Sequence, residues 1–167
     1  MKKAEKSKTS SSGLASKTAE KQLAGFINKF SAEVSSQAFL ALEKMRAWLP
    51  GAVELVYDNY NALAIGFGPS ERTSDAVFSI AVYPRWVSLF FLHGAGMPDP
   101  KNLLKGAGNV VRHIVLKPIE LLEDQDVRNL MDVAIAREPK RIDPANQGRI
   151  VIKSISEKQR PRRAEGN

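Results

Sequence analysis

The fold is decided by the run WVSLFFLH at residues 86–93, which follows a second run of the same kind, VFSIAVY, at residues 77–83. Both runs are dense in β-branched and aromatic residues, and only Pro84 and Arg85 separate them, so they predict a β-hairpin. After a loop rich in glycine, proline and aspartate, the chain returns to an apolar run at 110–116. This run predicts a further strand, so that two strands bracket the loop.

Two more strands are expected before the hairpin, because the hydrophobic pattern has a period of two. Val53, Leu55 and Tyr57 alternate with acidic residues, and turn-forming residues follow at 58–61. In the next run, over 62–67, large apolar residues alternate with alanine and glycine. The small residues leave a smooth face against which another segment can pack closely.

Helical periodicity flanks these strands on both sides. Apolar residues at 23, 26, 27 and 30 predict an amphipathic helix, and a second helix follows, with Ser31 or Ser35 as its N-cap and its end at 50–51. Asp124 is expected to cap a last helix over 124–135. The order predicts an α+β fold: a two-layer sandwich whose mainly antiparallel five-stranded sheet is covered by N- and C-terminal helices. Residues 149–155 leave open a sixth strand at the sheet edge.

The net charge of +7 is concentrated at the two ends of the chain. Residues 1–21 hold six lysines against two glutamates, and residues 137–167 hold nine basic against four acidic residues. We therefore expect a disordered basic tail over 1–21, a single domain over 22–137 and a basic extension over 138–167.

Composition narrows the class of protein. The chain has no cysteine, which excludes disulfides, thiolate nucleophiles and cysteine metal sites. No apolar run approaches the roughly 20 residues of a membrane span, and the N-terminus lacks the apolar region of a secretory signal. The expectation is a cytoplasmic protein without membrane contact.

The glycine-punctuated turn at 105–109 is the first candidate binding feature. Gly106 and Gly108 let backbone N–H groups turn toward an anion, and Lys105 and Arg112 supply positive charge. The alternative is that the glycines only shape a tight connection, since no helix and no third glycine follow as a dinucleotide-binding motif requires.

An aromatic and basic group is the second candidate. Its members are expected near strand ends, where they could stack on and clamp a planar anion. They are Tyr57, Tyr60, Arg85, Trp86 and Arg112. The alternative is ordinary packing at the sheet edge. The predicted ligand-binding set combines both features: Tyr57, Arg85, Trp86, Lys105, Gly106, Gly108 and Arg112.

No residue set indicates catalysis, and no cofactor is expected. His93 and His113 could form a metal pair only with further ligands, so we assign no metal site. The leading hypothesis is a non-enzymatic module for a small anionic ligand or a protein partner. Weak nucleic-acid contact through the basic ends is an alternative.

The motifs resemble those of one known family. The run at 83–91, Asp99-Pro100, the run at 103–108 and Arg112-His113-Ile114 together are similar to the YdhG-like family, a bacterial domain of unknown function. The similarity covers residues 22–137 and implies an α-β-β-β-β-β-α sandwich. Some members are described as frataxin-like iron chaperones, so the resemblance also implies an alternative function in iron handling. The first two helices carry only three glutamates, and no iron site is assigned to any residue.

Overall fold

The computed structural model describes residues 16–164. A helix over residues 16–27 comes first in this part of the chain, and α2 follows it. The elements after the first helix are α2 (Ala32–Trp48), β1 (Val53–Asp58), β2 (Leu63–Gly68), the short 3₁₀ helix η1 (Thr73–Asp75), β3 (Phe78–Val82), β4 (Val87–Phe91), β5 (Arg112–Val115), the 3₁₀ helix η2 (Ile119–Glu123), α3 (Gln125–Ala136) and β6 (Ile150–Ile155).

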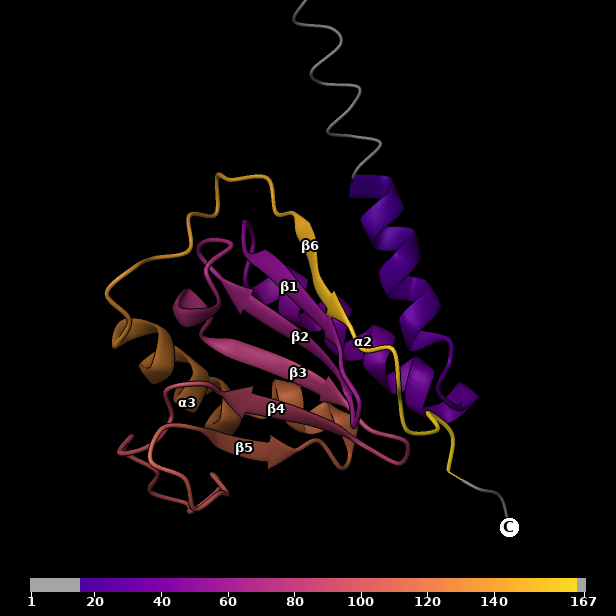
Figure 1. The fold of residues 1–167 in the computed structure, drawn as a ribbon. Coiled ribbons are helices and arrows are strands. Elements are labelled where there is room, and N and C mark those ends of the chain that lie inside the picture. The colour runs from indigo at the N-terminus through magenta and orange to yellow at the C-terminus, as the bar shows by residue number, and fades with distance from the viewer. Residues whose placement is uncertain (1–15, 165–167) are drawn as a thin grey trace, which may run out of the picture.

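The strands form one six-stranded sheet in the order β5-β4-β3-β2-β1-β6 (Figure 1). Neighbours from β1 to β5 are antiparallel, because each is joined to the next along the chain by a connection that reverses direction. β6 pairs parallel with β1 after the chain has returned from α3 across the molecule. The predicted α+β sandwich is confirmed, and the edge strand that the sequence left open is its sixth strand.

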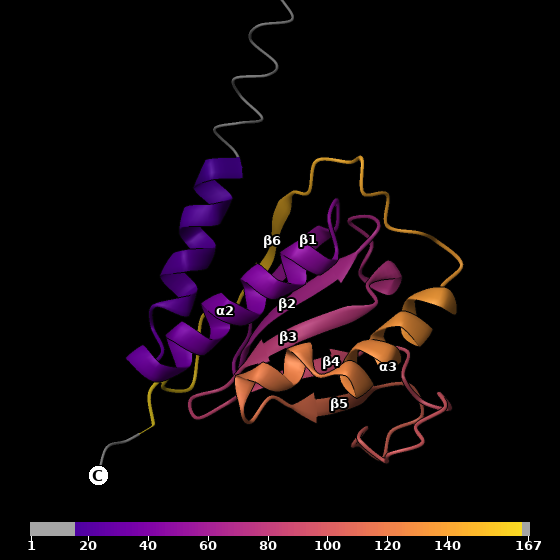
Figure 2. The same cartoon turned by 180° about the vertical axis from the view of Figure 1, so that it is seen from behind.

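α2 and α3 lie on one face of the sheet, and Figure 2 looks onto these two helices. Ser31 caps α2 by accepting a hydrogen bond from the Val34 amide, and Asp124 caps α3 through the amides of residues 126 and 127. The core between the layers includes Phe78, which meets Phe91 edge to face at 5.5 Å between ring centroids. Burial of such aromatic side chains is the main source of stability in a domain of this size.

The N-terminal boundary differs from the predicted one. Residues 16–21, for which the composition predicts a disordered tail, belong to the first helix. The reason is that Ala19 continues the buried stripe of Leu23 one turn earlier, and that Glu20 pairs with Arg46 of α2 at 2.8 Å. The prediction for residues 1–15 lies outside the described residues.

The C-terminal boundary differs as well. Residues 156–164, expected as part of a solvated basic extension, lie against the turn between β1 and β2. The Ser156 amide donates to the Asp58 carbonyl and the Arg160 amide to the Tyr60 carbonyl, each at 2.9 Å. Arg162 is 6 % exposed. The folded unit therefore extends well beyond residues 22–137.

Candidate ligand-binding site

The structure does not bring the seven predicted site residues together. β4 and β5 run antiparallel, with Ser88 opposite Val115 and Phe91 opposite Arg112. Arg85 and Trp86, just before β4, therefore lie at one end of the sheet, and Arg112 lies at the other. Lys105, Gly106 and Gly108 accompany Arg112 there, and Tyr57 lies on β1.

The glycine turn is a tight connection. Lys105 and His113 exchange two backbone hydrogen bonds of 2.8 and 2.9 Å, and Gly106 has a φ of +124°, which favours glycine. The guanidinium of Arg112 donates to the carbonyls of Gly108 and Val111. Both hydrogen bonds come from Nη1 of Arg112 and hold the loop in shape.

Tyr57 anchors a loop on the sheet. Its hydroxyl lies 2.7 Å from the hydroxyl of Thr73 in η1, and its ring packs against a small apolar cluster formed by Val53, Leu55 and Ala76. This cluster is on the face of the sheet opposite to α2 and α3. The apolar residues of β1 that the sequence pattern singled out therefore do not face the main core, where β1 instead contributes Val56.

Trp86 belongs to a stacked aromatic pair at the turn between β3 and β4. Its ring lies 4.8 Å from that of Tyr83, with an angle of 22° between the planes, and the Tyr83 amide donates to the Trp86 carbonyl. Burial raises the pKa of the Tyr83 hydroxyl above its ordinary value of 10.0. The Lys117 ammonium lies 5.8 Å from the Trp86 ring, in the range of a cation–π contact.

The C-terminal segment adds two arginines to this end of the sheet. Arg162 holds the segment in place through Asp58, so that Arg160 and Arg163, on either side of it, remain exposed to solvent. The Arg160 guanidinium lies 5.7 Å from the Tyr60 ring, and Arg163 donates to the Lys29 carbonyl. Figure 1 shows this yellow segment beside the turn that joins β3 to β4.

Between the segment and the turn lies an open hollow of about 770 Å³, which we call the arginine–tryptophan pocket. Its volume is typical of a small-ligand site. Among the described residues that line it, none is acidic. The lining residues are Asn61, Tyr83, Pro84, Arg85, Trp86, Arg160, Pro161, Arg163 and Ala164.

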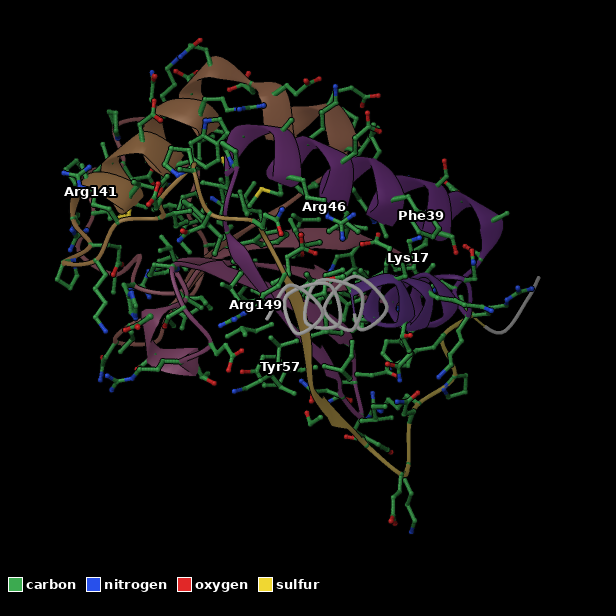
Figure 3. The ribbon with its side chains drawn as sticks, turned by 90° about the horizontal axis from the view of Figure 1, so that it is seen from above. Lys17, Phe39, Arg46, Tyr57, Arg141 and Arg149 are labelled. Carbon is green, nitrogen blue, oxygen red and sulfur yellow. The ribbon has the colours of Figure 1, made fainter. Side chains whose placement is uncertain are left out.

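The charged side chains of another cluster are paired with one another. Arg46, which is labelled in Figure 3, donates two hydrogen bonds of 2.8 Å to the carboxylate of Glu54. It donates two more to the carboxylate of Glu20. Burial raises the pKa of Glu54, and the hydrogen bonds from Arg46 oppose this shift. Arg46 thus ties the first helix, α2 and β1 together. The sequence holds one indication of this buried ion pair: alternation places Glu54 on the same face of β1 as Val56.

The two histidines have separate partners. Nδ1 of His93 lies 2.7 Å from a carboxylate oxygen of Glu138, whereas the His113 ring stacks on Phe90 at 5.2 Å. Within residues 16–164, no group of three histidine, aspartate or glutamate side chains is arranged to hold a metal ion. In the same part of the chain, no helix has the length and apolar character needed to cross a bilayer.

Comparison of the chain with known protein families, with curated proteins and with solved structures found no match. The YdhG-like resemblance therefore stays a prediction from the motifs.

Proposed function

We propose that the protein is a cytoplasmic binding protein whose arginine–tryptophan pocket takes a ligand that joins a planar ring to an anionic group. The observation that carries the proposal is that Arg85, Arg160 and Arg163 line the same hollow as the stacked rings of Tyr83 and Trp86. Aromatic faces accept a planar ring, and guanidinium groups bind phosphate or carboxylate through paired hydrogen bonds.

The surroundings of the three arginines support this proposal. Among residues 16–164, no carboxylate forms an ion pair with Arg85, Arg160 or Arg163. Exposed cations without a carboxylate partner on one concave surface attract anions, because their fields add.

The same lining favours binding over catalysis. Arginine keeps its proton at every pH at which a protein is folded, so the charged groups of the pocket do not act as general acids or bases. They can orient and hold a ligand.

The test uses AMP, which combines a planar base with a phosphate, and compares it with adenosine and with inorganic phosphate. Binding is measured by titration calorimetry and by the fluorescence of Trp86 in a Trp48→Phe background, in which Trp86 is the only tryptophan. We expect AMP to bind more tightly than either fragment and to quench Trp86. Arg85→Ala should weaken AMP binding about tenfold or more, the loss expected for one charge-assisted hydrogen bond.

Arg141→Ala is the matched control, because this substitution also removes one positive charge, but far from the pocket. Arg141 is exposed on the connection between α3 and β6 (Figure 3). The AMP affinity of this variant should equal that of the wild type. Absence of heat and of quenching up to about millimolar AMP, the weak end of ligand binding, would refute the proposal. Equal losses in Arg85→Ala and Arg141→Ala would also refute it, since they would indicate attraction by net charge alone.

A further inference from the structure

The face of the sheet opposite to α2 and α3 carries no α-helix in the described part of the chain, and Figure 1 looks directly onto it. The loop containing η1 covers one part of this face, where Ala76 lies close to Gly66 and Gly68. Another part of the face is hollowed. This hollow, which we call the sheet groove, has a volume of about 540 Å³.

The floor and the walls of the sheet groove differ in character. Its floor is made of small side chains, with Ala64 paired to Ala81 across β2 and β3 and with Ser79 beside them. Its walls are aromatic: Tyr60, which is 49 % exposed, Tyr83 and Phe90. The imidazole of His113, its cross-strand partner on β5, stacks on one face of the Phe90 ring at an angle of 26°. Aromatic walls beside a floor without bulky side chains form a surface on which a nucleobase can stack.

The sheet groove continues into the arginine–tryptophan pocket, since Asn61 and Tyr83 line both hollows. Each hollow alone has the size of a small-ligand site, so the continuous surface is longer than one small ligand needs. Among the described residues lining the two hollows, no side chain is acidic, and positive charge gathers at the pocket end with Lys117 close to Trp86. A surface of this length, with aromatic rings along it and cations at one end, complements a chain of bases joined by phosphates.

We propose that a short single-stranded nucleic acid lies along the sheet groove and places one nucleotide in the arginine–tryptophan pocket. This inference rests on the proposed function, because the pocket supplies the phosphate contacts. A single strand fits better than a duplex, since the bases of a duplex are stacked on one another and cannot reach aromatic side chains on a sheet.

Binding is measured by fluorescence anisotropy with labelled oligouridylates from about two to about eight nucleotides long, a range that includes the smallest sites of single-strand binding folds. We expect affinity to rise with length and then to level off, and a duplex of equal length to bind more weakly. The affinity should also fall with salt concentration, with a slope of about −0.7 for each phosphate contacted.

Phe90→Leu is the decisive variant, because it removes the stacking ring but keeps an apolar side chain at a half-exposed position. It should weaken the longer oligouridylates about tenfold, the loss expected for one stacked base, and leave AMP affinity unchanged. Phe39→Leu is the matched control: Phe39 is a phenylalanine on α2 with 37 % exposure, and its substitution should change neither affinity. Arg85→Ala should weaken both AMP and the oligonucleotides. Thermal unfolding of each variant checks that it is folded, and Phe90→Trp, which restores a ring, should recover binding if Phe90→Leu loses stability.

Two results separate this inference from the proposed function. If AMP binds and depends on Arg85, but the oligouridylates bind no more tightly than AMP, or a duplex binds as well as a single strand, then the sheet groove does not hold nucleic acid and the pocket proposal stands. If neither AMP nor any oligouridylate binds, both proposals fail. Oligouridylate binding that is indifferent to Phe90→Leu also overturns the inference, since it would place the strand elsewhere.

Discussion

Arg162 and Asp58 form an ion pair of 2.8 Å in which the two side chains keep only 4 % and 1 % of their surfaces exposed. The pair joins residues 104 positions apart, and the Arg162 guanidinium also lies 5.6 Å from the Phe30 ring. The Lys29 ammonium lies 3.3 Å from the other oxygen of the same carboxylate. The position of the C-terminal segment, and with it of Arg160 and Arg163, depends on this contact.

The first prediction concerns the free energy of unfolding. Arg162→Ala should lower it by about 3 kcal/mol, because removal of one partner leaves a buried carboxylate with only Lys29 to compensate it. Arg163→Ala, one position along and exposed, should change it by less than about 0.5 kcal/mol. Urea unfolding monitored by circular dichroism gives both values. A cost for Arg162→Ala below about 1 kcal/mol would mean that the segment is not held by this pair.

The second prediction concerns pH. Because burial raises the pKa of Glu54 above its ordinary value of 4.5, the folded state binds a proton at this site more tightly than the unfolded state. The contribution of Glu54 to stability is therefore largest at low pH and declines as pH rises from about 4.5 through the raised pKa. The free energy of unfolding of the wild type minus that of Glu54→Gln should fall over this window. A difference that stays flat or grows with pH would contradict the expectation and indicate that Arg46 dominates the titration.

The third prediction uses two glycines of β2. A Cβ atom added at Gly68 would lie 2.8 Å from the Cα of Ala76, too close for backbone, whereas one added at Gly66 would lie at an ordinary 3.6 Å from its nearest neighbour. Gly68→Ala should cost about 1–3 kcal/mol, because the loop containing η1 must move away from the sheet. Gly66→Ala should be tolerated within about 0.5 kcal/mol. Equal effects of the two substitutions in thermal or urea unfolding would show that the loop is not tightly packed at Gly68.

Local patterns were sufficient to predict the α-helices and the strands β1 to β5. Two runs dense in β-branched and aromatic residues predicted the hairpin of β3 and β4, and helical spacing with a capping aspartate predicted α3. These signals depend on residues within a few positions of one another, so they can be read from one sequence. The small residues of β2 likewise indicated a face for close packing, which the loop with Ala76 occupies at Gly66 and Gly68.

Contacts between distant residues could not be predicted in the same way. A run of arginines such as 160–163 ordinarily indicates a solvated tail, and only the buried carboxylate of Asp58 gives Arg162 a place in the interior. The parallel pairing of β6 with β1 and the distance between Arg85 and Arg112 also follow from the path of the chain, not from any local motif. For this reason the site predicted from the sequence combined residues from two opposite ends of the sheet. The same prediction did not include Arg160 and Arg163.

The last prediction tests whether the ligand binds at the end of the sheet that holds Arg85 and not at the end that holds Arg112. Arg112→Ala removes a guanidinium that donates to the carbonyls of Gly108 and Val111 at a partly exposed position, so it should loosen the loop before β5 at a cost of about 1 kcal/mol or less. Amide hydrogen exchange should become faster at Lys105 and His113, whose backbone groups close this loop, while AMP affinity remains that of the wild type. Arg85→Ala should show the reverse: unchanged exchange at Lys105 and His113, with weakened AMP binding. A loss of AMP affinity in Arg112→Ala as large as that in Arg85→Ala would instead place the ligand at the glycine turn, where the sequence motif alone first located it.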